Sequence, residues 1–330
     1  MLILDSDTTR ALLPFAKLVP ALRDAFIRGC EVPQRHSHVI DPHGAAPGTM
    51  LLMPSWQAGA YLGVKTVTIY PGNTLAGLPG LYSTYLLHDA CTGKPLAMID
   101  GNEITSRRTA AASALAASYL SRHDASSMLV LGAGRVASLL PHAYRTIRPI
   151  QRVAVWDINA SQGEALAARL LADGFEARFV PTIAAACEDA DIVTSATLST
   201  SPLVQRAWLR PGTHLDLIGG FTPAMREADD GCFESTSVFV DTSEAVLKAG
   251  DLLHPIEAGV LKAADIRATL ADLCQQRHPG RADDTEITLF KAVGTALEDL
   301  AAAVMAYEGF EGSPHTTPRA ESHGNARRQA

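Results

Sequence analysis

The residues of this chain best suited to chemistry are a glycine-rich turn and one carboxylate downstream of it. Gly132, Gly134 and Ala137 form the pattern G-x-G-x-x-A directly after the apolar run 128–131. The first glycine allows a sharp bend, the second lets backbone approach a pyrophosphate, and the small third residue lets helix and strand pack closely. Asp157 ends the next apolar run, 20 residues after Ala137, where a carboxylate meets the ribose of a bound dinucleotide. The spacing therefore predicts a dinucleotide site.

The surroundings of this motif strengthen the prediction and favour NAD(H) over NADP(H). A strand precedes the turn, a helix is expected through about residue 147, and a second strand at 152–156 leads into Asp157. This context argues against the alternative, a strand-turn-helix that binds nothing. A 2′-phosphate beside Asp157 would meet like charge, and the two residues that follow supply no arginine to receive it. Arg152 and Arg169 are the arginines that could fold over from elsewhere.

Three cations of the amino-terminal third form a second group with chemical potential. Lys65 lies inside an apolar strand pattern, Arg108 opens an alanine-rich helix, and Arg35 follows a proline in a loop. A cation in the first turn of a helix opposes the helix dipole, so Arg108 indicates a bound anion or a structural salt bridge. If the three converge beside a nicotinamide, they would clamp a carboxylate. On the pattern alone, Lys65 fits a solvated lysine on an open sheet face equally well.

The composition argues against several other classes of protein. Of the 330 residues, 47% are hydrophobic and 19% charged, and a net charge of −7 without a basic face argues against a nucleic-acid partner. The chain opens without a basic region leading into a long apolar run, and no membrane-length apolar stretch follows, so we expect a soluble cytoplasmic protein. An odd number of scattered cysteines predicts free thiols, at Cys30, Cys91, Cys187, Cys232 and Cys274.

Metal and nucleophile chemistry are not predicted. His36, His38, Asp41 and His43 lack H-E-x-x-H or comparable ligand spacing, and histidines in such a loop are more often solvated. Cys187 lies in a helical pattern, where a core position is more common than a nucleophile. The sequence contains no G-x-S-x-G elbow of a serine hydrolase.

Apolar periodicity predicts two kinds of sheet. Strand-like runs joined by short turns, with no helix between them, predict a mostly antiparallel sheet at 49–53, 61–69, 82–89 and 95–100. Beyond a helix at 104–122, helices alternate with the strands of a parallel sheet at 128–131, 152–156, 177–180, 191–196, 215–219 and 237–241. Further helices are predicted at 5–28, 160–171, 183–188 and 287–307. The fold class is therefore α/β: a Rossmann-type doubly wound parallel sheet plus an α+β substrate and dimerisation domain.

Seven ordered motifs resemble the ornithine cyclodeaminase/mu-crystallin family from about residue 35 to residue 306. They are LLMP (51–54), GVKTVTIYPGN (63–73), ITSRRTAA (104–111), LGAGRVA (131–137), ADIVTSAT (190–197), HLDLIGG (214–220) and ITLFKAVGTALEDLAAA (287–303). The resemblance implies a homodimer. It also implies that a Rossmann domain, 123–299, is inserted into a substrate-binding domain made of 1–122 and 300–311. The polar segment 312–330 is expected to be a disordered tail.

The resemblance also implies roles for individual residues. Arg35, Lys65 and Arg108 would hold the substrate carboxylate, with Lys65 and Arg108 as the catalytic residues. Phe221 and Val293 would complete the substrate pocket. The cofactor would contact Gly132, Gly134, Arg135, Val136, Ala137, Asp157, Thr197, Leu215, Ile218, Gly219 and Ala292. Because neighbouring helical positions diverge by about 100°, Arg107 should point away from the pocket.

One departure from the family pattern selects a branch. True ornithine cyclodeaminases have GGD-C-P, whose aspartate handles the amine, where this chain has GGFTP (219–223). The phenyl ring of Phe221 can neither take a proton nor pair with an ammonium group. The segments GGFTPAMREADD (219–230) and PGLYSTYLLHDACTG (79–93) resemble the ketimine reductases instead. That branch reduces Δ1-pyrroline-2-carboxylate to L-proline and often Δ1-piperideine-2-carboxylate to L-pipecolate.

The sequence thus favours NADH- or NADPH-dependent reduction of a cyclic 2-imino acid, with NADH preferred because of Asp157. The imine proton would come from solvent or from Lys65. Three alternatives stay open: an alanine or other small amino-acid dehydrogenase, an ornithine cyclodeaminase, and a non-catalytic mu-crystallin-like protein that binds NADPH and a ligand.

Overall fold

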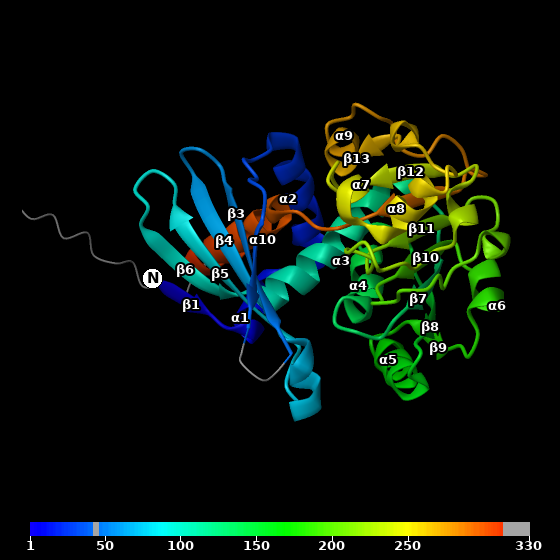
Figure 1. The fold of residues 1–330 in the computed structure, drawn as a ribbon, viewed down its shortest axis with the longest axis horizontal. Helices are drawn as coiled ribbons and strands as arrows, with labels where there is room; N and C mark the ends of the chain where they lie inside the picture. Colours follow the sequence, from blue (N-terminus) through cyan, green and yellow to red (C-terminus); the bar gives the residue numbers. More distant parts are fainter. Residues whose placement is uncertain (42–45, 313–330) are drawn as a thin grey trace, which may run out of the picture.

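A computed structural model describes residues 1–41 and 46–312, and it contains two β-sheets bridged by a long helix (Figure 1). The first sheet has the strand order β1-β6-β5-β4-β3-β2 and is antiparallel except for the β1–β6 pair. Its strands are β1 Leu2–Leu4, β2 His36–Ile40, β3 Gly48–Trp56, β4 Tyr61–Ile69, β5 Leu81–Asp89 and β6 Pro95–Asp100. The predicted antiparallel sheet is confirmed, and β1 and β2 are added to it.

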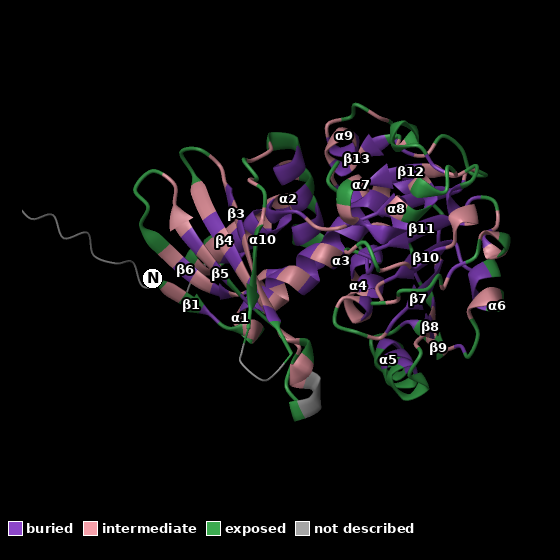
Figure 2. Cartoon of the chain, viewed as in Figure 1, coloured by how far each residue is buried: buried purple, intermediate pink, exposed green. Residues whose placement is uncertain are grey.

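The second sheet is parallel throughout, with the order β13-β12-β14-β11-β10-β7-β8-β9. Its strands are β7 Ser127–Leu131, β8 Arg152–Trp156, β9 Glu176–Phe179, β10 Ile192–Ser195, β11 His214–Leu217, β12 Ser237–Val240, β13 Ala268–Thr269 and β14 Thr288–Lys291. Every residue of β7, β10, β11 and β14 is buried, as expected for strands covered on both faces (Figure 2). The predicted α/β class is confirmed.

Helices cover the sheets and connect them. They are α1 Ser6–Leu12, α2 Phe15–Arg28, α3 Gly101–Leu120, α4 Leu140–Tyr144, α5 Ala160–Ala172, α6 Ile183–Glu188, α7 Ala245–Lys248, α8 Gly250–Glu257, α9 Leu270–Cys274 and α10 Ala296–Glu311. Helix α3 contacts β5 of the first sheet and β11 and β14 of the second, so this single helix packs against both sheets. Helix α10 returns to pack on β3 and β4. None of the described helices is long and apolar enough to cross a membrane.

The helix predicted at 5–28 is instead two helices, α1 and α2. Leu13 and Pro14 separate them, because proline disfavours the helical conformation in the residue before it. Leu13 accordingly has φ −115° and ψ 52°. The N-cap of α1 is Asp5, whose carboxylate accepts a hydrogen bond from the N–H of Thr8 at 2.9 Å.

The segment 287–307, predicted as one helix, contains a strand and a helix. Its first part is β14, which lies between β11 and β12, and α10 begins only at Ala296. The run of threonine, leucine and phenylalanine suits a buried strand, and Gly294 interrupts the segment with φ +78°. The predicted domain boundary at residue 300 falls inside α10. The predicted tail beyond Gly312 lies outside the described residues.

Candidate active site

The glycine-rich turn lies at the topological switch point of the parallel sheet. Strand β8 lies on one side of β7 and β10 lies on the other. The loops that leave the carboxyl ends of β7 and β10 therefore diverge and leave a crevice between them. Gly132 has φ +101°, and a Cβ there would lie 2.9 Å from the carbonyl oxygen of Ala196. A Cβ on Gly134 would meet no atom within 4 Å, so its backbone is open to a ligand. Ala137 is fully buried.

The helix after the turn is shorter than predicted. A 3-10 turn, Ala137–Leu139, leads into α4, which ends at Tyr144 rather than near residue 147. Pro141 is tolerated because it occupies the first turn of α4, where its missing N–H breaks no helical hydrogen bond.

Asp157 lies beside the glycine-rich turn. Its carboxylate accepts hydrogen bonds from the N–H groups of Ala133 and Asn159, each at 2.7 Å. These bonds fix the carboxylate at the end of β8, next to the turn. Arg152 begins the same strand and therefore lies at its opposite end, and Arg169 is in the last turn of α5. Neither arginine is positioned to receive a 2′-phosphate beside Asp157.

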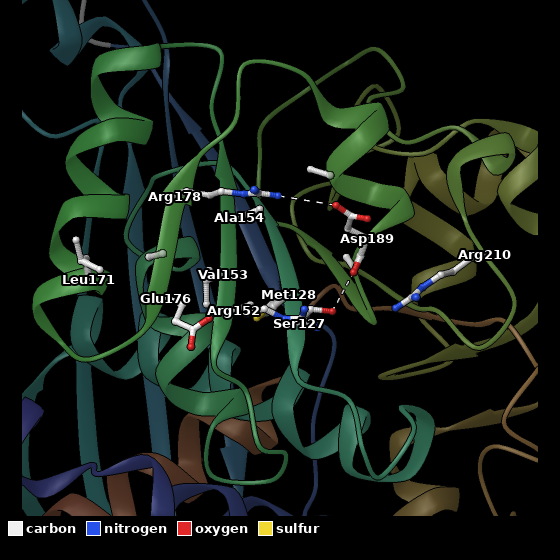
Figure 3. A pocket seen from close by; sticks show the side chains of 13 residues that line it. Ser127, Met128, Arg152, Val153, Ala154, Leu171, Glu176, Arg178, Asp189 and Arg210 are labelled. Atoms are coloured by element: carbon white, nitrogen blue, oxygen red, sulfur yellow. Dashed lines mark hydrogen bonds and ion pairs between the residues drawn. The ribbon is translucent and has the colours of Figure 1, made fainter.

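A separate hollow of about 750 Å³ surrounds Arg152 (Figure 3). It is lined by the first residues of β7, β8 and β9, at the amino ends of the strands. Its charges are partly paired, since Arg178 lies 3.9 Å from Asp189. Apart from Arg152, it contains none of the residues predicted to bind cofactor or substrate.

The predicted cations converge on a different cavity, of about 260 Å³, between the two sheets. Strand β4 contributes Lys65, α3 contributes Arg108, and the loop before β2 contributes Arg35. Apolar side chains form most of the remaining wall: Leu51, Met53, Val67, Ile69, Leu81, Phe221 and Val293. Predicted cofactor residues line the side nearest the parallel sheet: Val136, Thr197, Ile218, Gly219 and Ala292. The cations and the glycine-rich crevice therefore share one site.

Two buried acidic side chains, Asp299 and Glu298, pair with Lys65 and Arg108. Lys65 is 2% exposed, and its Nζ lies 2.6 Å from Oδ2 of Asp299, which excludes the solvated alternative. Arg108 places Nε 2.8 Å from Asp299 and Nη1 2.6 Å from Oε2 of Glu298. Helix α3 begins at Gly101, so Arg108 lies two turns into it. The expected first-turn position was wrong, and the ion pairs explain the cation.

Burial and pairing shift the pKa values of these groups. Desolvation lowers the pKa of Lys65 to about 8, although Asp299 opposes the shift. Burial alone would raise the pKa of Asp299, but the adjacent Lys65 and Arg108 hold it below its usual value. Asp299 thus stays ionised and fixes the two cations in the cavity wall.

The loop before α10 must approach Arg108 closely. A Cβ on Gly294 would lie 2.6 Å from Nη1 of Arg108, and its positive φ also favours glycine. Asp241 accepts hydrogen bonds from the N–H groups of Val293 and Gly294, at 2.8 and 2.6 Å. This carboxylate therefore holds the loop that closes the cavity.

A second buried network of charged side chains stabilises the loops that line the crevice. Glu227 accepts five hydrogen bonds of 2.6–3.2 Å, from the Ser195 hydroxyl, the N–H and hydroxyl of Thr197, and the N–H groups of Gly219 and Gly220. Asp251 accepts from the N–H of Glu227 at 2.7 Å and pairs with Lys291 at 2.9 Å. All three charged side chains are fully buried. The network ties together the segments that line the cofactor side.

The remaining predicted residues fall outside the cavity or at its mouth. Leu215 is in the middle of β11 and is completely buried in the core, so it supports the sheet and does not line the site. Arg135 is exposed on the turn. Phe221 is 41% exposed. Arg107 leaves the cavity: it donates to the carbonyl of Leu13 at 2.8 Å and lies over the ring of Phe15.

Several charged residues of the site were not predicted from the sequence: Asp241, Glu227, Asp251, Lys291, Glu298 and Asp299. A signal for the last two was present, because a glutamate and an aspartate stand next to each other in an apolar, alanine-rich stretch. Such a pair requires buried cations as partners. In the described chain no group of three or more His, Cys, Asp or Glu could hold a metal ion, and His43 lies outside that part.

Comparison with known proteins identifies relatives along nearly the whole chain. An uncharacterised protein of Schizosaccharomyces pombe is 45% identical over 317 residues, which is 92% of this chain and 96% of that protein. A Δ1-pyrroline-2-carboxylate reductase of Paracoccus denitrificans is 41% identical over 261 residues, 78% of this chain and 82% of the relative. The solved Δ1-pyrroline-2-carboxylate reductase of Thermococcus litoralis, in complex with NADH and L-proline, has a TM-score of 0.87 at 35% identity, covering 94% and 97% of the two chains.

A model of the ornithine cyclodeaminase/mu-crystallin family matches residues 3–313. This match and the relatives confirm the resemblance noted in the sequence motifs. The chain therefore belongs to the ornithine cyclodeaminase/mu-crystallin family.

Proposed function

We propose that the protein reduces a cyclic 2-imino acid with NADH or NADPH, converting Δ1-pyrroline-2-carboxylate to L-proline. Δ1-Piperideine-2-carboxylate, which gives L-pipecolate, is the proposed second substrate. The observation that carries this proposal is the convergence of Arg35, Lys65 and Arg108 on one cavity at the switch point. Reductases of this name among the similar proteins support it. The five unpaired cysteines fit a reducing, cytoplasmic location.

The residues present fit a nicotinamide dinucleotide. Gly134 leaves its backbone open for a pyrophosphate, and the hydrogen bond from Ala133 holds Asp157 beside the turn, where its carboxylate would meet the ribose. Thr197, Ile218 and Ala292 face the cavity on the same side. When bound, the nicotinamide supplies the hydride of the reaction.

The clamp of cations orients the substrate. Arg108 offers a planar guanidinium, Lys65 a point charge, and Arg35 a third cation at the loop. Held by its carboxylate, the imine presents C2 at a fixed position, which lowers the entropic cost of hydride transfer. Phe221 and the apolar wall suit a ring of methylene groups and offer nothing to a distal ammonium group.

A spectrophotometric panel tests the function. Loss of NADH absorbance is expected with Δ1-pyrroline-2-carboxylate and Δ1-piperideine-2-carboxylate. Turnover of pyruvate with ammonia would instead indicate an alanine dehydrogenase, and ammonia release from ornithine a cyclodeaminase. Ligand binding without turnover of any of these compounds would indicate a non-catalytic NADPH-binding protein.

Asp157 is expected to set the cofactor preference. Asp157→Asn keeps an oxygen acceptor for the N–H of Ala133 but removes the charge that repels a 2′-phosphate. The ratio of kcat/KM for NADH to that for NADPH should fall about 10- to 100-fold, as expected for one close like-charge contact. Steady-state kinetics with both cofactors measures the ratio. Asp173→Asn, an exposed aspartate of the same domain, is the control and should leave it unchanged.

The first sheet supports a homodimer as the assembly. The cross-strand row Met53, Lys65, Tyr85 and Ile99 is buried on the face that α3 and α10 cover. The next row, Pro54, Val64, Leu86 and Met98, points to the opposite face and is only half-buried. This half-buried apolar row, next to Thr66 and Thr84 on the same face, favours a second copy of the chain as its cover.

Val64→Asp is expected to produce a monomer. A carboxylate in the middle of an apolar interface would be desolvated without a partner, which costs several kcal/mol. Light scattering after size-exclusion chromatography measures the mass. Leu171→Asp is the matched control, since this leucine is 60% exposed on α5 of the other sheet. A dimeric Val64→Asp protein would contradict the assignment of this face.

A further inference from the structure

Glu298 is a buried carboxyl group with one oxygen unused. It is the third residue of α10 and is 1% exposed. Its Oε2 lies 2.6 Å from Nη1 of Arg108, whereas its Oε1 has no hydrogen-bond partner among the described residues. No other carboxyl group of the described chain lines the cavity. A buried acid with a free oxygen is costly to maintain, which points to a ligand as its partner.

The surroundings of Glu298 leave it able to exchange a proton. Burial raises the pKa of Glu298 to about 7, against the opposing effect of Arg108. The nearby anions Asp241 and Asp299 act in the same direction as burial. The other charges at the cavity are Lys65 and Arg35. A substrate carboxylate bound at the cations would add another negative charge and would further favour the protonated form of Glu298.

We propose that Glu298 is the catalytic acid that protonates the imine nitrogen of the substrate. The nitrogen is bonded to C2, which also carries the carboxylate, so an acid next to Arg108 lies beside the reacting bond. The inference rests on the proposed reduction of a cyclic imine.

Atoms and charge balance in this step. The carboxyl proton of Glu298 moves to the imine nitrogen, which leaves a glutamate anion beside an iminium cation. Hydride from the reduced nicotinamide then forms the new C–H bond at C2, and the C=N π electrons become the lone pair of the amine. Solvent protonates the amine product and restores the acid form of Glu298. The reduction itself consumes one imine, one NADH and one proton.

Lys65 is less suited to this role. Its ammonium group lies 2.6 Å from Asp299, and losing a proton would leave that buried carboxylate with Arg108 as its remaining cation. A cation also disfavours the positive charge of an iminium, whereas the anion of Glu298 stabilises it. Lys65 therefore holds the carboxylate and Glu298 handles the proton.

Glu298→Gln tests the assignment in the intact protein. Single-turnover hydride transfer from NADH to Δ1-pyrroline-2-carboxylate at pH 7 should slow by at least about 100-fold, the usual contribution of a general acid. Binding of NADH and of L-proline should stay within about threefold, since the cations remain. The wild-type kcat/KM, which reports the free enzyme, should fall above pH about 7, where Glu298 loses its proton. The Glu298→Gln protein should lack this break and follow protonation of the free imine.

Controls separate the possible outcomes. Glu308→Gln, an exposed position of the same helix, should behave as wild type. Glu298→Asp should recover part of the rate together with the pH break, and it carries the test if Glu298→Gln does not fold. Unchanged hydride transfer in Glu298→Gln, or a parallel loss of L-proline binding, would overturn the role as acid while leaving the proposed function intact. A wild-type protein that reduces no cyclic imine would overturn both.

Discussion

Arg108→Ala is expected to lower kcat/KM for the imine by about 10³-fold or more. The change would remove the proposed bidentate contact to the substrate carboxylate, two charge-assisted hydrogen bonds that are each worth roughly 1.5–3 kcal/mol. It also removes the cation that pairs with Glu298, and it leaves Asp299 with Lys65 as its remaining partner in the pair. Steady-state kinetics with NADH measures the loss. Arg108→Lys, which keeps the charge but not the planar fork, should fall between alanine and wild type.

Arg107→Ala is the neighbouring control. Its guanidinium donates to the carbonyl of Leu13 and lies over Phe15, outside the cavity. We expect it to lower the melting temperature while changing kcat/KM little. Equal losses of kcat/KM in the two variants would refute the assignment of Arg108 as the substrate ligand.

Glu227→Ala is expected to destabilise the protein by about 3–5 kcal/mol, because it leaves buried N–H and hydroxyl donors without an acceptor. Five hydrogen bonds end on this carboxylate, and they hold the segments of Thr197 and Gly219 that are proposed to contact the cofactor. Affinity for NADH should therefore fall together with the free energy of unfolding. Chemical denaturation followed by circular dichroism measures the latter.

Glu234→Ala provides the comparison for Glu227. This glutamate is exposed in the same part of the chain, and its removal should change neither stability nor NADH binding. If Glu227→Ala unfolds at the wild-type denaturant concentration, the network does not have the structural role assigned to it.

The parts of the site that the sequence predicted are those encoded locally. The glycine-rich turn can be predicted from its own spacing. A sharp bend, an open backbone and close packing each need a small residue at a fixed position. Asp157 is likewise predicted locally, because it directly follows the next apolar strand. Lys65 and Arg108 stand out because charged residues in apolar or alanine-rich segments need an explanation.

The parts that were missed depend on distant pairing. Nothing near Glu298 indicates that its partner is Arg108, 190 residues away. The short apolar run that forms β14 could equally belong to the beginning of a helix. Its position between β11 and β12 in the folded sheet makes it a strand. Pro14, in contrast, is a local signal in the sequence, and it is what divides the first predicted helix into α1 and α2.

The ion pairs that α10 forms with Lys65 of β4 and Arg108 of α3 have a consequence for biosynthesis. While the chain leaves the ribosome, Lys65 and Arg108 emerge long before Asp299, which is 191 residues beyond Arg108. Burying either cation without its counter-ion would be strongly unfavourable. We therefore expect β4 and α3 to reach their final packing only after α10 has been translated. The parallel sheet waits almost as long, because β14, which lies between β11 and β12, is translated directly before α10. Both sheets are therefore completed only when nearly the whole chain has been made.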